Sequence, residues 1–373
     1  MPLFKNQNNN SDNYNNILVG TNIYNNIGTI LEKKLSYKPF LAIITDNNVA
    51  SLYLKPIEES LSTSGFTFIK IIIPVGESSK SFCQVQDIIN KLSQHKIKRN
   101  DFIIALGGGV VGDIAGFVAS IYMRGIGFIN IPTTLLAQID ASIGGKTAIN
   151  NSFGKNLVGS FYNAYLIIID TQFLRSLNER DFISGYAEIL KYGLINDDKF
   201  FRFCEEQVDN IFLHKSALNY IIEQCIFKKI EIVKQDKFDQ NQRALLNLGH
   251  SFGHALEHYC AYNTELLIHG EAVAIGLVLA FQFSAYLGLC SNDCAIRLTK
   301  HLEKVGLPTT INIKIFNQLK PNSLLEAMSF DKKNINNMFN LILAKGIGKA
   351  FIAKEIPRET LFKFFTKILD KEN

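Results

Sequence analysis

The sequence predicts a parallel-sheet α/β domain followed by a mainly α-helical domain. Between residues 40 and 170, short apolar runs alternate with amphipathic stretches of helical length. Runs of this kind are typical of strands buried on both faces, and strands that alternate with helices form parallel sheets. After Asp170 the apolar residues recur at helical spacing instead. We therefore expect two domains, 17–172 and 173–373, with the boundary near 171–175.

The first domain is expected to contain five strands separated by helices. The strand-like runs are LAIIT (41–45), FIKIIIP (68–74), FIIAL (102–106), GFINIP (127–132) and YLIIID (165–170). The amphipathic stretches between them predict helices at residues 49–63, 79–97 and 111–123.

In the second domain, a long apolar series at helical spacing is followed by no comparable strand run before NLILAKG (340–346). The series consists of Leu218, Ile222, Cys225, Ile226, Ile230 and Val233. The uncharged stretch from Ala272 to Cys290 is long enough to cross a bilayer. Its polar residues Gln282, Ser284 and Tyr286 favour a buried helix instead, so we expect no membrane partner.

Composition narrows the class of protein. The chain has 373 residues, 47% of them apolar, which is enough for two hydrophobic cores. Its net charge of +5 is spread along the chain, which argues against nucleic-acid binding and suits a small anionic substrate. Six dispersed cysteines without a CxxC pair, and no apolar signal segment, predict a cytoplasmic protein. The Asn-rich residues 1–16 are expected to be a flexible leader.

A glycine-rich loop follows the third apolar run. In GGGVVGD (107–113), Gly107, Gly109 and Gly112 form a GxGxxG pattern between a strand and a helix, where glycines let backbone amides approach phosphate oxygens. No acidic residue follows at about twenty residues, the usual place for a ribose ligand. Asp46, after the first strand, is therefore the candidate for the acidic residue that binds the ribose. A tight turn that needs glycine for steric reasons alone is the alternative to a dinucleotide site.

Four of the seven histidines fall between Asn247 and Gly276. His250 and His254 are four residues apart, so they share one face of a helix and could bind one metal ion. The alternative is chance clustering on an ordinary helix surface. Potential anion ligands precede this stretch, including Lys146, which follows paired glycines and is less typical of a solvated face.

Several motifs, in this order and spacing, resemble the 3-dehydroquinate synthase family. They are GGGVVGD, MRG, PTTLLAQIDASIGGKTAIN, GKN, GYAEILKYG, NLGHSFGHALE and HGEAVAIG, and the resemblance covers roughly residues 17 to 350. It implies an N-terminal domain that binds NAD and an α-helical domain that binds a divalent metal, usually zinc, with cobalt as the alternative. The substrate is expected between them.

The resemblance assigns a role to most of the polar positions. The implied metal ligands are Glu188, His250 and His269, whereas His254 becomes a substrate-site histidine and His258 has no role. The implied NAD positions are Asp46, Asn48, Glu77, Lys80, Gly108, Gly109, Asp113, Thr133, Thr134, Lys155 and Thr171. The implied substrate positions are Arg124, Asp140, Lys146, Asn156, Lys191, Lys229, Arg243, Asn247, His254 and the Asp331-Lys332-Lys333 motif, with Lys333 as the expected cation.

Two further expectations follow from the resemblance. Arg124 is expected to reach the neighbouring subunit's site, which implies a homodimer. The run DQNQR (239–243) departs from the family pattern, because Asp239 stands where glutamate is typical and Asn-Gln replaces a glycine–aliphatic pair. The shorter Asp239 side chain makes a proton-relay role at this position an open question.

The implied reaction converts 3-deoxy-D-arabino-heptulosonate 7-phosphate into 3-dehydroquinate and phosphate. NAD oxidises the C5 hydroxyl, phosphate is eliminated, the same NADH reduces the ketone, and an intramolecular aldol step closes the ring. The cations suit the carboxylate and phosphate of this substrate, and His254 is the expected proton-transfer group.

Three other functions fit parts of the sequence. Another sugar-phosphate cyclase shares the loop and metal positions, but its substrate lacks the carboxylate that Lys229, Arg243 and the DKK motif suit. A metal-dependent polyol dehydrogenase shares the two-domain plan, but does not need so many cations. A non-catalytic metal or nucleotide-binding regulator leaves Glu188, the lysines and both histidines unexplained.

Overall fold

The structure, a computed structural model, describes residues 16–214, 217–236, 242–311, 316, 319–329 and 338–371. Three expectations lie outside these residues: the leader at 1–15, Asp239 of the DQNQR run, and the DKK motif with Lys333. The chain divides into two compact units. Unit 1 runs to Asn178 and includes Ile222–Ile230, and unit 2 contains Glu179–Ile221 and the chain after Ile230. The predicted domain boundaries assigned the segment Ile222–Ile230 to the second domain, whereas in the structure it belongs to unit 1.

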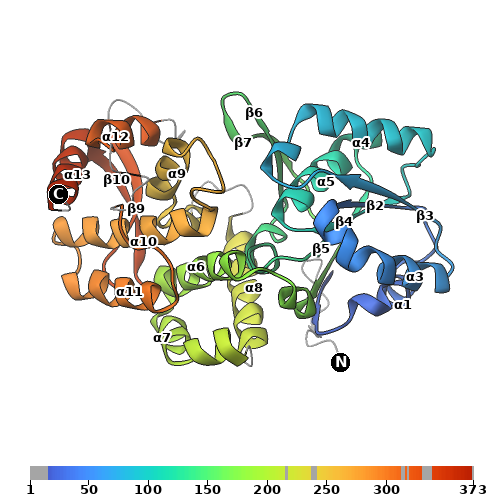
Figure 1. The fold of residues 1–373 in the computed structure, drawn as a ribbon, viewed down its shortest axis with the longest axis horizontal. Helices are drawn as coiled ribbons and strands as arrows, with labels where there is room; N and C mark the ends of the chain where they lie inside the picture. The colour runs from blue at the N-terminus through green and yellow to red at the C-terminus, as the bar shows by residue number, and fades with distance from the viewer. Residues whose placement is uncertain are drawn as a thin grey trace. The chain divides into compact units, whose positions relative to one another are not determined.

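Unit 1 is built on a six-stranded sheet whose paired strands are all parallel, with the order β1-β8-β5-β4-β2-β3. Figure 1 labels β2, β3, β4 and β5 of this sheet. The strands are β1 (Ile17–Gly20), β2 (Leu41–Asp46), β3 (Phe68–Ile73), β4 (Phe102–Gly107), β5 (Gly127–Pro132) and β8 (Leu166–Asp170). All five predicted strands are present. The four-residue strand β1 was not predicted, because it is too short to show a pattern and pairs only with the distant β8.

Helices cover both faces of this sheet. Leu41 and Ile43 of β2 pack with α1 (Ile27–Lys34) and α3 (Lys55–Thr63) on one face. Ala42 and Ile44 pack on the other face with α4 (Phe82–Gln94) and α5 (Gly109–Ile121). Successive strand side chains point to opposite faces, so a strand covered on both sides must be apolar throughout. The short helix α2 (Asn47–Val49) and a π-helical turn (Ala50–Leu54) lead directly into α3.

The strand order creates one switch point in the sheet. From β2 the chain moves outward to β3, then crosses to β4 on the other side of β2. In parallel sheets, ligands bind beyond the carboxyl ends of the strands where the connections diverge in this way. The ends of β2 and β4 are Asp46 and Gly107, so the acidic residue and the glycine loop lie on neighbouring strands. This topology explains why the loop follows the third predicted strand rather than the first.

An antiparallel hairpin projects from unit 1 and was not predicted. It consists of β6 (Lys146–Asn151) and β7 (Gly154–Phe161), and its strands make their own two-stranded sheet. Asn151 Oδ1 accepts hydrogen bonds from the backbone amides of Phe153 and Gly154, which closes the turn. The pattern KTAINN alternates only weakly between apolar and polar residues, so it shows no clear strand signal.

Unit 2 is mainly helical. Its helices are α6 (Glu179–Asn196), α7 (Asp198–Glu206), α9 (His250–Tyr259), α10 (His269–Tyr286), α11 (Asn292–Lys304), α12 (Pro321–Ser329) and α13 (Arg358–Lys371). The predicted strand at 340–346 is present as β9 (Met338–Ala344), paired antiparallel with the unpredicted β10 (Ala350–Pro357). The long helix α8 (Leu218–Gln235) contributes residues to both units.

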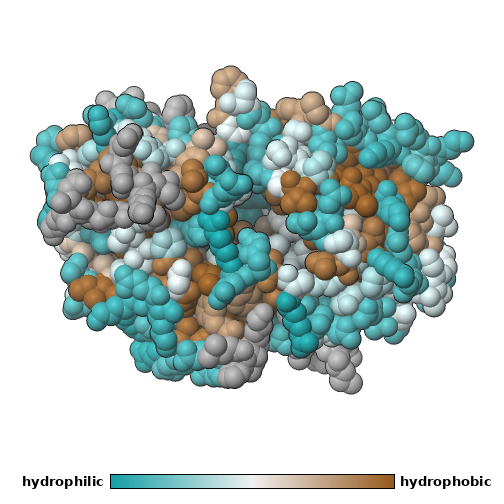
Figure 2. All heavy atoms as spheres, in the orientation of Figure 1, coloured by the Kyte–Doolittle hydropathy of each residue, from teal (hydrophilic) through white to brown (hydrophobic). Residues whose placement is uncertain are grey.

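Helix α10 forms the core of unit 2, which confirms the buried helix predicted for the uncharged stretch. Residues Ala272–Phe281 are all buried, and the helix packs against α6, α9, α11 and β9. Among the residues that the structure describes, no helix is both long and apolar enough to span a membrane. Over the face in view in Figure 2, hydrophilic residues are interspersed with apolar ones.

Candidate metal centre and cofactor sites

Three helices of unit 2 bring Glu188, His250 and His269 together. Glu188 lies in the middle of α6, whereas His250 and His269 are the first residues of α9 and α10. A Cβ atom on Gly270 would lie 2.0 Å from the carbonyl oxygen of Ser184, so only glycine allows α10 to begin this close to α6. Ser184 and Glu188 are one turn apart on α6, and the close approach therefore sets His269 beside Glu188.

A second close approach positions His250. Gly249, just before α9, has a φ of +80°, and a Cβ on Gly276 of α10 would lie 2.1 Å from its carbonyl oxygen. The start of α9 is therefore held directly against α10. Because glycines stand at both helix contacts, the three ligand candidates are fixed by backbone packing rather than by flexible loops.

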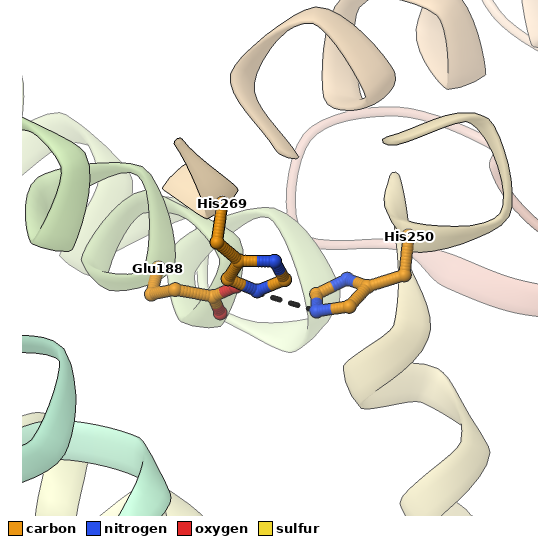
Figure 3. Close-up of side chains that lie close together, drawn as sticks. All are labelled: Glu188, His250 and His269. Atoms are coloured by element: carbon orange, nitrogen blue, oxygen red, sulfur yellow. Dashed lines mark ion pairs between the residues drawn. The ribbon is translucent and has the colours of Figure 1, made fainter. Parts of the chain in front are cut away.

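The side chains converge as a metal site requires. His250 Nε2 lies 3.3 Å from Glu188 Oε1, and His269 Nε2 lies 3.6 Å from the same oxygen. Ligands bound at about 2.1 Å to a tetrahedral zinc ion lie roughly 3.4 Å from one another. Figure 3 shows the two rings and the carboxylate pointing toward one another. The spacing is thus that of ligands around one shared ion.

The remaining ring nitrogens already have partners. Nδ1 of His250 lies 3.2 Å from the carbonyl oxygen of Leu248, and Nδ1 of His269 lies 3.3 Å from Glu257 Oε2. A hydrogen at Nδ1 leaves the Nε2 lone pair available, which is the tautomer that a metal ligand needs. Both imidazoles therefore present the same nitrogen to Glu188.

Buried charge surrounds this group. Glu188 is fully buried and forms ion pairs with Lys191 as well as with both histidines. Burial opposes ionisation of the carboxyl, but Lys191 and His250 lower the pKa of Glu188 well below its usual value. Burial also opposes protonation of His269, yet Glu188 and Glu257 raise its pKa to about 10, so a metal ion bound at Nε2 would have to displace the proton held there. The carboxylate is therefore ionised at neutral pH and ready to bind a cation.

These residues fit a divalent metal ion. Lys191, His250 and His269 form ion pairs with Glu188, but within the described part of the chain neither of its oxygens has a hydrogen-bond partner of normal geometry. A further cation beside Lys191 would stabilise a buried carboxylate in this state. One carboxylate and two imidazoles form the donor set of a catalytic zinc site, which leaves further positions open for substrate oxygens.

His254 lies beside these three residues and is exposed. Its ring is 5.3 Å from that of His250 and 6.0 Å from that of His269, measured between centroids. With Glu257 and His269 it forms a second group whose ligand atoms lie within 4.8 Å of one another. His258 is also exposed, on the helix surface, as expected.

Arg180 fixes the segment that leads into His269. Its guanidinium binds both carboxylate oxygens of Glu271, at 2.7 and 2.8 Å, and donates to the carbonyls of Thr264 and Glu265. Glu271 also accepts a hydrogen bond from the amide of Ile268, which caps α10. Arg180 is in the first turn of α6, so this contact ties the start of α10 to the helix that carries Glu188.

In unit 1, the expected NAD positions gather at one edge of the sheet. Asp46, Gly108, Thr133 and Thr171 stand at or directly after the carboxyl ends of β2, β4, β5 and β8, and Glu77 follows β3. The N-terminus of α5 has no side-chain cap, so its first amides remain available to a phosphate group. A Cβ on Gly108 would lie 3.0 Å from Thr134, which shows how closely this loop packs. The edge fits a dinucleotide.

A buried lysine connects several of these positions. Lys80 is 4% exposed, and its ammonium lies 2.6 Å from Asp113 and 3.6 Å from Glu77, and also contacts Asn156. Burial raises the pKa of Asp113 above its usual value, although Lys80 opposes this shift. Asn156 has a φ of +56°, which aims its side chain from β7 toward Lys80. The structure thus joins expected NAD positions to an expected substrate position.

The other expected substrate residues fall into two groups. Lys191, Lys229 and Arg243 are almost fully buried, and Lys229 pairs with Asp140. Asn247 is half-buried at the end of the short 3-10 helix that contains Arg243.

Lys146 and Arg124 are instead exposed, which corrects the expectation that Lys146 is set apart from a solvated face. Lys146 begins the hairpin strand β6, in which its side chain is exposed and that of the next residue, Thr147, is buried. Arg124 has a φ of +62° in a strained turn with Met123 and Gly125. Asn48 is also exposed, and Lys155 is half-buried on β7.

Reasoning from the sequence missed three contributors. Glu257 is seven residues from His250, a spacing that places both on one helix face and could have indicated it. The Arg180–Glu271 pair and Asn150, whose amide binds Glu77 at 2.8 Å, join residues far apart in the chain. No spacing rule links such residues.

Comparisons with known proteins agree with this arrangement. The 3-dehydroquinate synthase N-terminal family matches residues 70–184, and the 3-dehydroquinate synthase C-terminal family matches residues 185–334. The 3-dehydroquinate synthase of Bartonella bacilliformis is 47% identical over 92% of this chain and 92% of its own length. The 3-dehydroquinate synthase of Rhizobium johnstonii is 43% identical over 93% of this chain and 92% of its own length.

Solved structures show the same fold. The 2-epi-5-epi-valiolone synthase of Streptomyces hygroscopicus subsp. jinggangensis, solved with NAD+ and Zn2+ bound, has a TM-score of 0.85 and is 26% identical, with 100% of both chains covered. A 2-deoxy-scyllo-inosose synthase, solved with carbaglucose-6-phosphate, NAD+ and Co2+, has a TM-score of 0.82 at 23% identity, over 94% of this chain and 96% of its own. The two family matches and the curated relatives together place this chain in the 3-dehydroquinate synthase family.

Proposed function

We propose that this chain is a 3-dehydroquinate synthase, which converts 3-deoxy-D-arabino-heptulosonate 7-phosphate into 3-dehydroquinate and phosphate with NAD and a divalent metal. The convergence of Glu188, His250 and His269 in unit 2 carries the proposal, because one carboxylate and two imidazoles form the donor set of a catalytic zinc site with positions left open for substrate oxygens. Curated relatives of 43–47% identity that bear this name support the choice of reaction.

In unit 2, Glu188, His250 and His269 would hold the metal, with zinc favoured and cobalt as the alternative. Once bound, the ion supplies Lewis acidity toward substrate hydroxyl oxygens. We assign the binding of an anionic group of the substrate to Lys191, which is buried against Glu188. His254 is exposed beside His250 and His269, and imidazole is the side chain that most often transfers protons in catalysis, so we assign proton transfer to its ring.

In unit 1, the carboxyl edge of the sheet would bind NAD, which supplies the hydride acceptor. The uncapped amides of α5 receive phosphate oxygens, and Asp46 accepts hydrogen bonds from a ribose. Lys80 holds Asp113 and Asn156 in place from a buried position. Asp140 fixes the ammonium of Lys229, so this cation is positioned before the substrate arrives. These residues orient the reactants and neutralise their charge.

Three further expectations belong to the same proposal, and they concern the assembly, the class of substrate and the cellular location of the protein. Arg124 is exposed on a strained turn, which suits a side chain that serves another subunit, so we propose a homodimer. We further propose that the substrate is a small anionic sugar phosphate rather than a nucleic acid or membrane component, and that the protein works in the cytoplasm. The charge distribution and the dispersed free cysteines support these two points.

One assay tests the reaction. The purified protein, loaded with NAD and zinc, is incubated with the heptulosonate phosphate while phosphate release and NADH absorbance are followed together. A synthase releases phosphate without accumulating NADH, because the hydride returns to the product. A polyol dehydrogenase would accumulate NADH instead. A different sugar-phosphate cyclase would leave this substrate unchanged and turn over a substrate without the carboxylate, and either result would contradict the proposal.

A further inference from the structure

Glu257 is a buried acid outside the metal ligands and expected substrate residues. Its side chain is 4% exposed, and it lies on α9 seven residues after His250. Its Oε2 lies 3.3 Å from Nδ1 of His269, on the opposite side of the ring from Glu188. A carboxylate is seldom buried unless a specific partner stabilises it. The arrangement is therefore a carboxylate–imidazole pair behind a metal-ligand position.

We propose that Glu257 is a positioning residue that holds His269 in its metal-binding tautomer and orientation. The inference rests on the proposed metal centre but not on the identity of the substrate. With Nδ1–H donated to Glu257, the Nε2 lone pair faces Glu188 and is available to the ion. The negative charge of Glu257 strengthens this hydrogen bond and makes Nε2 a better donor to the metal.

The two histidines differ in a way that explains why only one has this support. The side chain of His250 is 12% exposed, and its Nδ1 faces the neutral carbonyl of Leu248. The side chain of His269 is 33% exposed, so packing restrains its ring less. A free imidazole of this exposure can rotate or change tautomer. The carboxylate of Glu257 replaces the restraint that burial provides for His250.

The same acid could instead be a metal ligand, because His254, Glu257 and His269 form a second compact group. In that set His269 would offer Nδ1, so its ring would have to lose both protons to serve the Glu188 group through Nε2 as well. Two observations favour the positioning role: both Nε2 atoms lie within 3.6 Å of Glu188 Oε1, and His254, the third member of the second group, is exposed. The zinc affinities of Glu257 and Glu188 variants separate the two roles.

The test is the zinc affinity of the full-length protein, measured by competition with a chromophoric chelator in the absence of NAD and substrate. Glu257→Ala should weaken zinc binding by about 10- to 100-fold, the usual effect of losing such a partner. Glu257→Gln keeps an acceptor oxygen for Nδ1–H without the charge, so its loss should be smaller than that of the alanine variant. Exposed Glu265→Gln, in the nearby loop, is the control and should match wild type.

The cobalt-substituted absorption spectrum gives a second measurement. Glu257→Ala loaded at high cobalt should keep the ligand-field bands of the wild type, because the three ligands remain. Unchanged zinc affinity in a folded Glu257→Ala protein would overturn the proposal. Loss of stoichiometric binding in Glu257→Ala, with binding retained in Glu188→Gln, would make Glu257 a ligand and overturn it as well.

If the alanine variant does not fold, the near-isosteric glutamine variant decides by the same criterion: zinc affinity equal to wild type overturns the proposal. Because no substrate is present, failure of the synthase assay leaves this result intact.

Discussion

His269 illustrates how a single residue acquires its function from its surroundings. Its two ring nitrogens face two different carboxylates, Glu188 and Glu257, from two different helices. His254 shares a helix face with His250, yet it is exposed and lies outside the set that includes Glu188. Residue type and spacing alone suggested His250 and His254 as a pair. The partners of each ring nitrogen favour His250 and His269 instead.

The first prediction separates these histidines. His250→Ala should lose stoichiometric metal and activity, because it removes one of three ligands. His254→Ala should keep the metal and lose turnover by about 10²- to 10⁴-fold, the usual contribution of an acid–base group. Metal content by atomic emission and turnover by phosphate release check both variants. A metal-free His254→Ala protein beside a fully loaded His250→Ala protein would contradict the assignment.

At the scale of elements, helix packing positions the proposed metal ligands and also buries His301, a histidine outside that group. His301 on α11 lies between Tyr186 of α6 and Phe201 of α7, with its Nε2 3.1 Å from the Tyr186 hydroxyl. Burial lowers the pKa of His301 to about 4. The contact of α9 with α10 depends in turn on Gly276.

For His301, stability should fall on acidification. The folded-state pKa is about 4 and the unfolded value is near 6.5, so between these values only the unfolded chain gains the proton. Stability is therefore full above about pH 6.5 and decreases as the pH falls toward 4, by up to roughly 3 kcal/mol. His301→Gln should remove most of this slope in urea unfolding, whereas exposed His95→Gln should retain it. An unchanged slope in His301→Gln would contradict the burial argument.

For Gly276, a methyl group should separate the two helices. Gly276→Ala places Cβ 2.1 Å from the carbonyl of Gly249, so we expect a loss of about 1–3 kcal/mol in stability and weaker zinc binding. Gly112→Ala in α5 is the matched control for stability, since its Cβ comes no closer than 3.4 Å to the end of the Asn130 side chain. Thermal unfolding and zinc titration measure both effects. A Gly276→Ala protein as stable as wild type would show that the backbones can move apart freely.

At the scale of the whole molecule, the proposed homodimer makes each site depend on two chains. Lys146 and Arg124 are both exposed within a single chain. Arg124→Ala and Lys146→Ala should each give folded, inactive dimers. After subunit exchange, half of the dimers are mixed and each has one intact site of two, so about a quarter of wild-type activity should return. No recovery in exchanged samples, verified by mass, would remove the support for a shared site.

Much of unit 1 could be predicted from the sequence, and less of unit 2. Strands such as LAIIT and FIIAL are recognisable because a strand covered by helices on both faces is apolar throughout. The strand β1, the β6–β7 hairpin and β10 were missed. They are short or weakly alternating, and their pairing partners stabilise them more than their own composition does.

By itself, the sequence determined the fold class, the glycine loop and the residues available to bind metal and anions, because these depend on local periodicity and side-chain chemistry. Only the tertiary structure decided which of them meet. It set Asp46 beside the glycine loop through strand order, joined Lys80 to Asn156, and placed Glu257 behind His269. These contacts join separate elements, and their geometry follows from how helices and strands pack, which no local pattern specifies.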